Sequence, residues 1–528
     1  MGKNVIKAES VTPVVQTGIT ELDDILGGGL TANRVYLLHG TPGSGKTTLS
    51  LQFLLEGVRI GEKVLYVTLS ETRMELLAVA RSHNMSLEAV EIFELVAEDQ
   101  EFDPESQYTM FQPSEVELNV TTRRILDEIE RVKPKRVVID SLSEVKLLAQ
   151  SALRFRRQVL ALKQFFVGRE CTVLFLDDKT ARGEDDLQLE SIAHGVISLE
   201  QLAPDYGAER RRLSITKLRG QRYRGGYHDF TIQPGGLAVY PRIIASEHLK
   251  RNDRTVVRSG IPEMDSLLCG GLTSGTSVLL LGPAGVGKSS LSIQYAAEAA
   301  RHGMASIIFS FDERIETMFQ RAEGIGIPLR QYVEQGLIEI RAVDPAEMSP
   351  GEFAHKVRKA AEGENGLPVK IVIIDSLNGY LNAMPEERFL TAQLHELLTY
   401  LGHLGIITFL VVAQHGLLGN SMSTVIDTSY LADTVILFRY FESLGEVKQL
   451  ISVVKKRNGR HERTIREFSL GEGGIHIGEP LRKFHGVLTG TPFTANPGPD
   501  FGRGSFTRNG LDDALTPDAS GVNGPHAR

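Results

Sequence analysis

The chain contains 528 residues, of which 41% are hydrophobic and 23% are charged. Because a single hydrophobic core stops growing at about 250 to 300 residues, this length predicts two domains rather than one. The net charge of −8 excludes a general positive field that would attract phosphate backbones, so nucleic acid is not expected as a partner.

The N-terminal residues 1–12 contain no apolar segment of the kind found in signal peptides. The longest apolar runs, such as residues 278–281, are far shorter than the ~18 residues of a membrane span. The two cysteines, Cys171 and Cys269, lie far apart without CxxC spacing, which argues against a disulfide framework or a cysteine-rich zinc site. We therefore expect a cytoplasmic protein without membrane association.

An internal repeat organises the sequence. Residues 18–23 recur as residues 260–265, an offset of 242 residues (260 minus 18), and the same offset relates Lys46 to Lys288. Chance periodicity does not preserve an offset over such a distance. The order of the motifs is the same in both copies.

The repeat predicts the domain boundaries. The first domain is expected at residues 1–245 and the second at residues 246–485, joined through a charged stretch at residues 243–256. Residues 486–528 are rich in Gly, Pro, Asn, Ser and Thr and contain few residues able to form a core, so they predict a flexible, disordered tail.

In the first copy, residues 35–38 predict a buried strand, and a helical pattern begins at Thr48. The segment between them is a complete Walker A loop, which predicts an ATP site formed by Gly40, Thr41, Pro42, Gly43, Ser44, Gly45, Lys46, Thr47 and Thr48. Glycines allow backbone N–H groups to wrap phosphates, and the N-terminus of the helix favours the same anions. Lys46 is expected to reach the β- and γ-phosphates, and Thr47 to offer its hydroxyl to Mg²⁺.

Two further strands of the first copy are expected to bring carboxylates to the same site. Residues 64–71 form a strand pattern that ends in Glu71, a candidate for the group that orients the attacking water. An acidic helix start is the alternative for Glu71. Residues 136–140 form a Walker B pattern, which places Asp140 in the Mg²⁺ shell, with a simple strand-ending cap as the alternative.

A fourth strand in each copy also ends in polar residues. Residues 172–176 are followed by Asp177 and Asp178, and residues 408–412 lead to Gln414. Gln414 is a candidate sensor of the γ-phosphate, and an ordinary polar strand end is the alternative.

The second copy repeats the nucleotide motifs. Its Walker A loop predicts an ATP site formed by Gly282, Pro283, Ala284, Gly285, Val286, Gly287, Lys288, Ser289 and Ser290. Ser289 and the Walker B residue Asp375 are the expected Mg²⁺ ligands. The strand between the two motifs ends in Asp312 and Glu313, which are candidate catalytic carboxylates.

Each copy contains a late basic segment with two cations, Lys217 with Arg219 and Lys455 with Arg457. Strand alternation places the two cations of each pair on one face. They are candidate fingers that reach into the site of a neighbouring subunit and stabilise transition-state charge. A solvated basic strand face is the alternative.

With these motifs in order over residues 14–485, the chain resembles the KaiC family, which is known best from the cyanobacterial circadian clock. The resemblance implies an α/β fold with two tandem RecA-like P-loop NTPase domains, each a mostly parallel sheet flanked by helices. It also implies a double-ring homohexamer that uses ATP and Mg²⁺, with hydrolysis in the first ring and autophosphorylation in the second. A KaiB-like protein partner fits the first ring. A KaiA-type partner is not expected, because the tail shows no clear likeness to the segment that clock members offer to KaiA.

The family phosphorylates a Ser-Thr pair shortly before an Asp-Thr, and here the pair reads Ser429 and Tyr430 ahead of Asp433. The resemblance therefore implies Ser429 or Tyr430 as the phosphoacceptor. Because Tyr430 replaces the second hydroxyl residue, a two-site cycle does not follow, and Thr424 and Thr428 are nearby alternatives.

The leading hypothesis is an ATPase and serine/threonine autokinase of KaiC type that acts as a timing or signalling switch. One alternative is a RecA- or DnaB-like DNA-dependent ATPase, which the acidic balance disfavours. The other is a nucleotide-gated interaction module without kinase activity.

Overall fold

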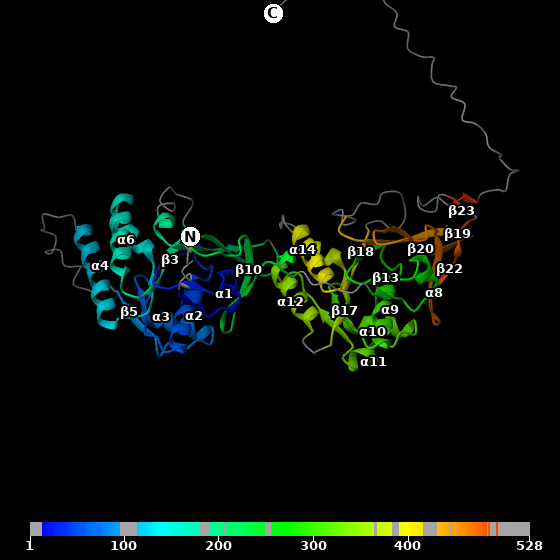
Figure 1. Cartoon of the computed structure of the whole chain (residues 1–528), viewed down its shortest axis with the longest axis horizontal. Helices are drawn as coiled ribbons and strands as arrows, with labels where there is room; N and C mark the ends of the chain where they lie inside the picture. Colours follow the sequence, from blue (N-terminus) through cyan, green and yellow to red (C-terminus); the bar gives the residue numbers. More distant parts are fainter. Residues whose placement is uncertain are drawn as a thin grey trace, which may run out of the picture.

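The computed structural model describes residues 13–95, 113–179, 189–204, 206–248, 255–363, 367–382, 390–414, 430–443, 445–482, 484–485 and 493–494. Within these ranges the chain forms two nine-stranded sheets, one after the other, which lie side by side in Figure 1. Each sheet is mostly parallel and is flanked by helices, which confirms the predicted fold class. We call the unit around each sheet the first and the second domain.

The first sheet has the strand order β11-β10-β9-β8-β3-β7-β6-β4-β5. From β8 to β5 the neighbours pair in parallel, whereas β9, β10 and β11 extend the sheet by antiparallel pairing. The central parallel strands β3, β4, β6 and β7 contain continuous apolar runs because both faces of the sheet are covered there. The strands are β3 (Val35–Gly40), β4 (Val64–Thr68), β5 (Glu91–Glu94), β6 (Arg136–Asp140), β7 (Thr172–Asp178), β8 (Gly195–Leu202), β9 (Arg210–Leu218), β10 (Tyr227–Gln233) and β11 (Gly236–Tyr240).

Helices cover both faces of the first sheet. One face packs with α1, α2 and α3 in a single apolar cluster, and the other face packs with α4, α5 and α6. The helices are α1 (Thr20–Ile25), α2 (Lys46–Arg59), α3 (Arg73–Ser82), α4 (Pro113–Val132), α5 (Leu142–Ala149) and α6 (Ala152–Phe166). A short ladder pairs β1 (Val14–Val15) with β2 (Leu30–Thr31) at the entry to the domain.

The second sheet repeats this arrangement with the order β16-β15-β17-β18-β14-β19-β20-β21-β22. From β16 to β19 the neighbours pair in parallel, and β20, β21 and β22 are antiparallel additions. The strands are β14 (Ser277–Gly282), β15 (Ala305–Ser310), β16 (Ile338–Ala342), β17 (Val369–Asp375), β18 (Ile407–Ala413), β19 (Thr434–Ser443), β20 (Glu446–Lys456), β21 (Arg466–Gly471) and β22 (Gly474–Pro480).

The helices of the second domain also divide between the two faces of its sheet. One apolar cluster holds α8 (Pro262–Leu267), α9 (Lys288–Arg301), α10 (Ile315–Gly324) and α11 (Leu329–Glu334). The other holds the 3₁₀ turn η3 (Ala245–His248), α12 (Pro350–Glu362), α13 (Leu377–Asn382) and α14 (Leu390–His403). In the part of the chain that the structure describes, no helix has the length and apolar character needed to cross a membrane.

Two short ladders complete the second domain. The first pairs β12 (Val256–Val257) with β13 (Leu272–Thr273), at the position that β1 and β2 occupy in the first domain. The second pairs β23 (Phe484–His485) with β24 (Phe493–Thr494). β24 therefore lies in the segment after residue 485, to which the composition assigned no structure.

The two domains contact each other through β10 and β11 of the first and α12 of the second, which lie together at the centre of Figure 1. Asp229 Oδ2 accepts a hydrogen bond of 2.7 Å from Gly351 N in the first turn of α12. The rings of Tyr240 and His355 pack with 5.3 Å between their centroids. Ala245, the last residue of the first predicted domain, belongs to an apolar cluster of the second.

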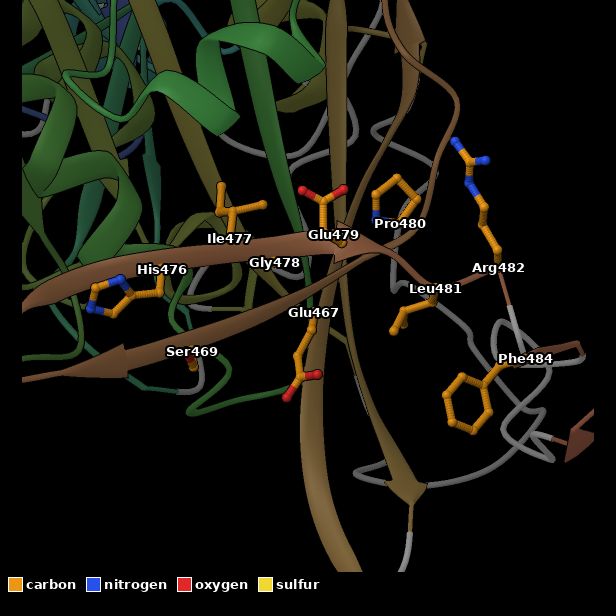
Figure 2. A pocket seen from close by; sticks show the side chains of 10 residues that line it. All are labelled: Glu467, Ser469, His476, Ile477, Gly478, Glu479, Pro480, Leu481, Arg482 and Phe484. Atoms are coloured by element: carbon orange, nitrogen blue, oxygen red, sulfur yellow. The ribbon is translucent and has the colours of Figure 1, made fainter.

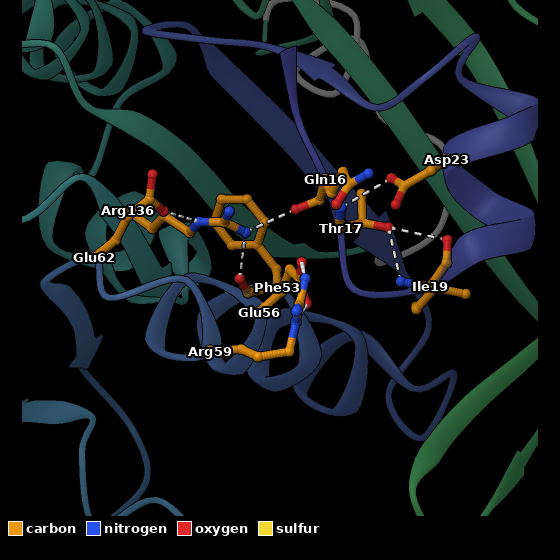
Figure 3. A network of polar contacts seen from close by, with 9 residues as sticks. All are labelled: Gln16, Thr17, Ile19, Asp23, Phe53, Glu56, Arg59, Glu62 and Arg136. Carbon is orange, nitrogen blue, oxygen red and sulfur yellow. Dashed lines mark hydrogen bonds and ion pairs between the residues drawn. The ribbon is translucent and has the colours of Figure 1, made fainter.

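A buried arginine connects the Walker B strand of the first domain to its P-loop helix. Arg136 begins β6 and is only 1% exposed. Its guanidinium bonds to Glu62 Oε2 at 2.6 Å, to Gln16 O at 2.7 Å and to Phe53 O at 2.8 Å (Figure 3). The same group lies 4.9 Å from the centre of the Phe53 ring. Strand pairing places the apolar Ile371 at the corresponding position of the second domain, so this network belongs to the first domain alone.

We expect Arg136→Ala to destabilise the first domain by about 3–5 kcal/mol, because removal of the cation leaves Glu62 and two carbonyl groups without their partner. Hydrogen exchange, measured by mass spectrometry on peptides from β6 and α2, should report the lower free energy of opening. Peptides from the second domain provide the internal reference.

Lys135→Ala is the matched control, because Lys135 neighbours Arg136 in the sequence but pairs with Glu170 on the surface, where both side chains are at least half exposed. An exposed ion pair contributes little to stability. Equal protection losses in the two variants would contradict the role assigned to Arg136.

Candidate nucleotide sites

The first P-loop follows the central strand of its sheet and leads directly into a helix. β3 ends at Gly40 and α2 begins at Lys46. Gly43 and Gly45 have φ values of 79° and 97°, in the left-handed region that favours glycine. Ser44 Oγ is buried and has no hydrogen-bond partner among the described residues. The loop therefore has the backbone shape and the uncommitted donors that suit a phosphate chain.

The Lys46 ammonium is held by three acceptors. Its Nζ donates to Gly40 O and to Thr41 O, each at 3.0 Å. It also forms an ion pair of 2.8 Å with Asp178 Oδ1, at the end of β7. The sequence motif predicted the lysine, but nothing in the motif indicated this carboxylate.

The second P-loop has the same backbone with a different environment for its lysine. Gly285 and Gly287 have φ values of 77° and 98°. Lys288 Nζ donates to Gly282 O at 2.9 Å and to Pro283 O at 2.6 Å. Burial lowers the pKa of Lys288 to about 8.

Each predicted Mg²⁺ hydroxyl lies next to its predicted Walker B aspartate. In the first domain, Thr47 Oγ1 is 3.5 Å from Asp140 Oδ2, and Tyr66 donates to the same oxygen at 2.5 Å. Burial raises the pKa of Asp140, and the hydrogen bond from Tyr66 opposes that shift. In the second domain, burial raises the pKa of Asp375, and the Ser289 hydroxyl opposes it.

These pairs fit a magnesium ion that is bound together with a nucleotide. Mg²⁺ usually takes one or two protein oxygens and completes its shell with phosphate oxygens and waters. Among the residues that the structure describes, no group of three or more His, Cys, Asp or Glu side chains is arranged for a metal ion. A hydroxyl and one carboxylate at each P-loop therefore match a shared site rather than a site built by the protein alone.

Glu71 lies beside the first P-loop with a carboxylate oxygen that makes no hydrogen bond. Its backbone is fixed by Thr68, whose hydroxyl accepts from Glu71 N at 3.0 Å and donates to Glu71 O at 2.6 Å. Glu71 Oε2 is buried without a partner among the described residues. Burial, and then the carboxylates of Asp140, Glu75 and Asp178, raise the pKa of Glu71. A raised pKa suits a group that must accept a proton near neutral pH.

The corresponding carboxylates of the second domain, Asp312 and Glu313, form hydrogen bonds with neighbouring side chains. Arg321 Nη2 pairs with Glu313 Oε2 at 2.6 Å, and Arg321 Nε donates to the other oxygen at 3.1 Å. The same guanidinium donates to Ser290 Oγ at 3.0 Å. Asp312 accepts a short hydrogen bond from the Ser376 hydroxyl. Arg321 was not predicted, because it lies on α10, outside every motif.

A pocket brings the predicted residues of the second domain together. It is lined by Gly285, Gly287, Lys288, Ser289, Ser290, Asp312, Glu313, Arg314, Thr317, Arg321, Asp375 and Leu470. The lining combines P-loop backbone, three hydroxyls, three carboxylates, two arginines and the P-loop lysine. Such a set is suited to a polyphosphate and its metal ion.

Strand pairing shows which strand-end residues correspond in the two domains. Gly40 lies opposite Asp178 in β7, and the equivalent Gly282 lies opposite Ala413 in β18. Asp178 is therefore replaced by Ala413 in the second domain. Gln414, the candidate sensor, follows Ala413, and its Oε1 is buried without a hydrogen-bond partner among the described residues.

The four candidate fingers lie at the ends of β9 and β20, away from the P-loops that they follow in sequence. Lys217 Nζ and Arg219 Nη2 both donate to Ser191 O, at 3.3 and 3.2 Å, so the two cations share one face as predicted. Lys455 lies on β20, and Arg457 follows that strand. A role in a neighbouring subunit remains a prediction.

Of the candidate phosphoacceptors, only Tyr430 lies within the described residues. Tyr430 is 52% exposed and precedes β19, and its carbonyl accepts a hydrogen bond of 3.0 Å from Arg457 Nη2. Ser429, Thr424 and Thr428 lie outside the described residues.

A separate hollow lies at the outer edge of the second sheet (Figure 2). It is lined by Glu467, Ser469, His476, Ile477, Gly478, Glu479, Pro480, Leu481, Arg482 and Phe484. Alternation along β21 turns Phe468 and Leu470 toward Gly287 of the P-loop and leaves Glu467 and Ser469 for the hollow. The strand therefore separates the hollow from the nucleotide site.

Two P-loops of this form, each with an adjacent hydroxyl and Walker B aspartate, define a tandem P-loop nucleotide-binding protein. A family model described as "ATPase: KaiC" matches residues 15–243 and 257–482. The chain belongs to this family and is therefore a KaiC-family ATPase.

Curated relatives extend over nearly the whole chain. The circadian clock oscillator protein KaiC of Parathermosynechococcus lividus is 28% identical over 92% of this chain and 89% of the relative. The protein of the same name from Acaryochloris marina is 28% identical over 93% of both chains. The one from Synechococcus elongatus is 28% identical over 90% of this chain and 91% of the relative.

We expect Arg321→Val, which introduces the residue found at the equivalent first-domain position 79, to raise ATP hydrolysis by the second domain. A carboxylate bound by a guanidinium is a poor proton acceptor, so release of Glu313 should give about a tenfold gain, part of the ~10²–10⁴ that a general base contributes. Phosphate release should be measured in a Glu71→Gln background, which suppresses turnover in the first domain.

Arg330→Ala is the control, since Arg330 pairs with the exposed carboxylates of Glu316 and Glu323 and stacks on Phe319, without contact to Glu313. A fall in turnover with Arg321→Val would mean that Arg321 assists the reaction rather than restraining Glu313.

Proposed function

We propose that this chain is an ATP-driven switch of KaiC type, which hydrolyses ATP in its first domain and phosphorylates itself in its second. The observation that carries the proposal is the contrast between Glu71 and Glu313 on otherwise similar P-loops. Glu71 has a buried oxygen without a partner, whereas Glu313 is bound by Arg321. The first domain thus has a strand-end glutamate oxygen available to a water molecule, whereas both oxygens of the equivalent Glu313 are bound by Arg321.

In the first domain, Lys46 and the loop amides would hold the phosphates, and Thr47 with Asp140 would hold Mg²⁺. Bound ATP supplies the phosphoryl group, and Mg²⁺ neutralises its developing charge. Glu71 orients the attacking water and accepts its proton, for which its raised pKa is suited. Transfer to water is then the favoured reaction of this domain.

In the second domain, restraint of Glu313 disfavours activation of water and leaves bound ATP available to a protein hydroxyl. Lys288 would hold the phosphates, and Ser289 with Asp375 would hold Mg²⁺. Asp312 is the remaining acidic group at the strand end and would accept the proton of the attacking hydroxyl. Ser429, or else Tyr430, is the proposed acceptor of the phosphoryl group.

We also propose that the chain assembles into a double-ring homohexamer with ATP between subunits. Lys217 and Arg219 in one ring, and Lys455 and Arg457 in the other, would reach the site of the neighbouring subunit and stabilise transition-state charge. The relatives are named as circadian clock oscillator proteins, which supports a timing or signalling role and a KaiB-like partner on the first ring.

Glu71→Gln should lower ATP hydrolysis by the first domain by about 10²-fold, the lower end of what a general base contributes. Nucleotide affinity should be retained, since the P-loop lysine pairs with Asp178 rather than with Glu71. Phosphate release should be followed in a Lys288→Ala background, so that only the first domain turns over.

Glu88→Gln is the control for this prediction and should leave turnover unchanged. Glu88 is an exposed carboxylate of the same domain and is not among the groups that raise the pKa of Glu71. Normal turnover in Glu71→Gln would show that Glu71 only shapes the start of α3.

Incubation of the protein with Mg²⁺ and γ-labelled ATP should place label on the peptide that spans residues 427–433. Mass spectrometry should assign it to Ser429 or Tyr430. Lys288→Ala should abolish the label because the second P-loop loses its phosphate-binding cation, whereas Lys46→Ala should retain it.

Label that persists in Lys288→Ala would remove the kinase assignment from the second domain. Release of free phosphate without any label on the protein would leave an ATPase switch that acts through partner binding alone.

A further inference from the structure

The two P-loop lysines share a backbone environment but differ in one partner. Each ammonium donates to the last carbonyl of the central strand and to the next carbonyl of the loop. A lysine ammonium has three protons to donate. Lys46 directs the third to Asp178 at 2.8 Å, whereas the second domain has Ala413 in place of Asp178.

We propose that Asp178 competes with the terminal phosphate of a nucleotide for Lys46, and thereby weakens nucleotide binding at the first site. The residue is not part of any P-loop motif. It acts as an internal anion that occupies the lysine until a phosphate replaces it. This inference rests on the proposed nucleotide-binding role of the first P-loop.

The position of Asp178 is built into the fold. Its backbone N donates to Ser143 Oγ at 3.1 Å, and the next residue, Lys179, donates from its N to Gly40 O at 3.0 Å. Both bonds fix the end of β7 against α5 and the P-loop. Binding of a phosphate at Lys46 therefore requires the Asp178 side chain to move, rather than the strand.

The second domain holds the same strand end in the same place without the carboxylate. Asn378, which corresponds to Ser143, donates to Ala413 O at 2.9 Å and accepts from Ala413 N at 2.7 Å. Gln414 N donates to Gly282 O at 3.0 Å, as Lys179 N does to Gly40 O. The two sites therefore differ at this point in side-chain charge and not in backbone position.

The charge difference has a direct consequence for binding. Lys46 must give up a charge-assisted hydrogen bond before it can bind a phosphate, and such bonds are about twice as strong as neutral ones. The displaced carboxylate then remains close to an anion of the same sign. Among the described residues Lys288 has no such competitor, because Ala413 stands in place of Asp178.

The test is a binding measurement that needs no turnover. A fluorescent methylanthraniloyl-ADP is titrated, with Mg²⁺ and separately with EDTA, into the full chain carrying Lys288→Ala, so that only the first site reports. Asp178→Ala and Asp178→Asn should each lower the Kd by about tenfold, equivalent to about 1.4 kcal/mol. The reciprocal Ala413→Asp, in a Lys46→Ala background, should raise the Kd of the second site by a similar factor.

Glu88→Gln is the charge control, since it removes an exposed carboxylate of the first domain and should leave the Kd unchanged. An unchanged or higher Kd in the Asp178 variants would overturn the proposal. Weaker binding seen only with Mg²⁺ would overturn it in favour of a metal-shell role for Asp178. If Lys46→Ala combined with Lys288→Ala still bound the probe, the assignment of the P-loops themselves would fail instead.

Discussion

Both candidate sites depend on one constraint, which is the central position of β3 and β14 in their parallel sheets. Each of these strands ends in a glycine and turns through two positive-φ glycines directly into a buried helix. Parallel neighbours on both sides end at the same edge, so the Walker B aspartate and the strand-end carboxylates converge on the first turn of that helix. Without this arrangement, residues nearly 140 positions apart, such as Gly40 and Asp178, would not meet.

The two copies have kept this backbone while exchanging the charge partners of the same functional groups. In the first domain the P-loop lysine is ion-paired with Asp178, and the strand-end Glu71 has an oxygen without a partner. In the second domain the lysine donates to two carbonyl groups and, among the described residues, to no carboxylate, and Glu313 is paired with Arg321. In the first site the lysine is therefore the group whose charge is neutralised by a neighbour, and in the second site it is the glutamate. A difference in chemistry between the two domains follows from two side chains that lie outside the shared motifs.

The sequence predicted those parts of the sites in which local pattern and chemistry coincide. The Walker A loops and Walker B strands are recognisable in the sequence, because contact with phosphates requires a fixed order of residues. The two sheets confirm the predicted fold class. The ion pair of Lys46 with Asp178 depends on the register of β3 and β7, which no local pattern reveals. The contact of Arg321 with Glu313 requires a turn of known geometry between β15 and α10. Neither ion pair could be predicted from the sequence, because in both cases the tertiary structure determines which residues meet.

The first P-loop and the acidic pair of the second site are connected through strand β10, a hydrogen bond to α12 and an aromatic pair. Ile232 on β10 lies against the P-loop, and Asp229 on the same strand bonds to the first turn of α12. Phe353 of α12 packs edge-on against Phe311, 5.3 Å between ring centroids, and Phe311 directly precedes Asp312. One strand therefore contacts the P-loop and also holds α12, whose Phe353 packs beside the residue that precedes Asp312. These connecting residues belong to neither copy of the nucleotide motifs, so the contact between the domains does not use the residues proposed to bind nucleotide.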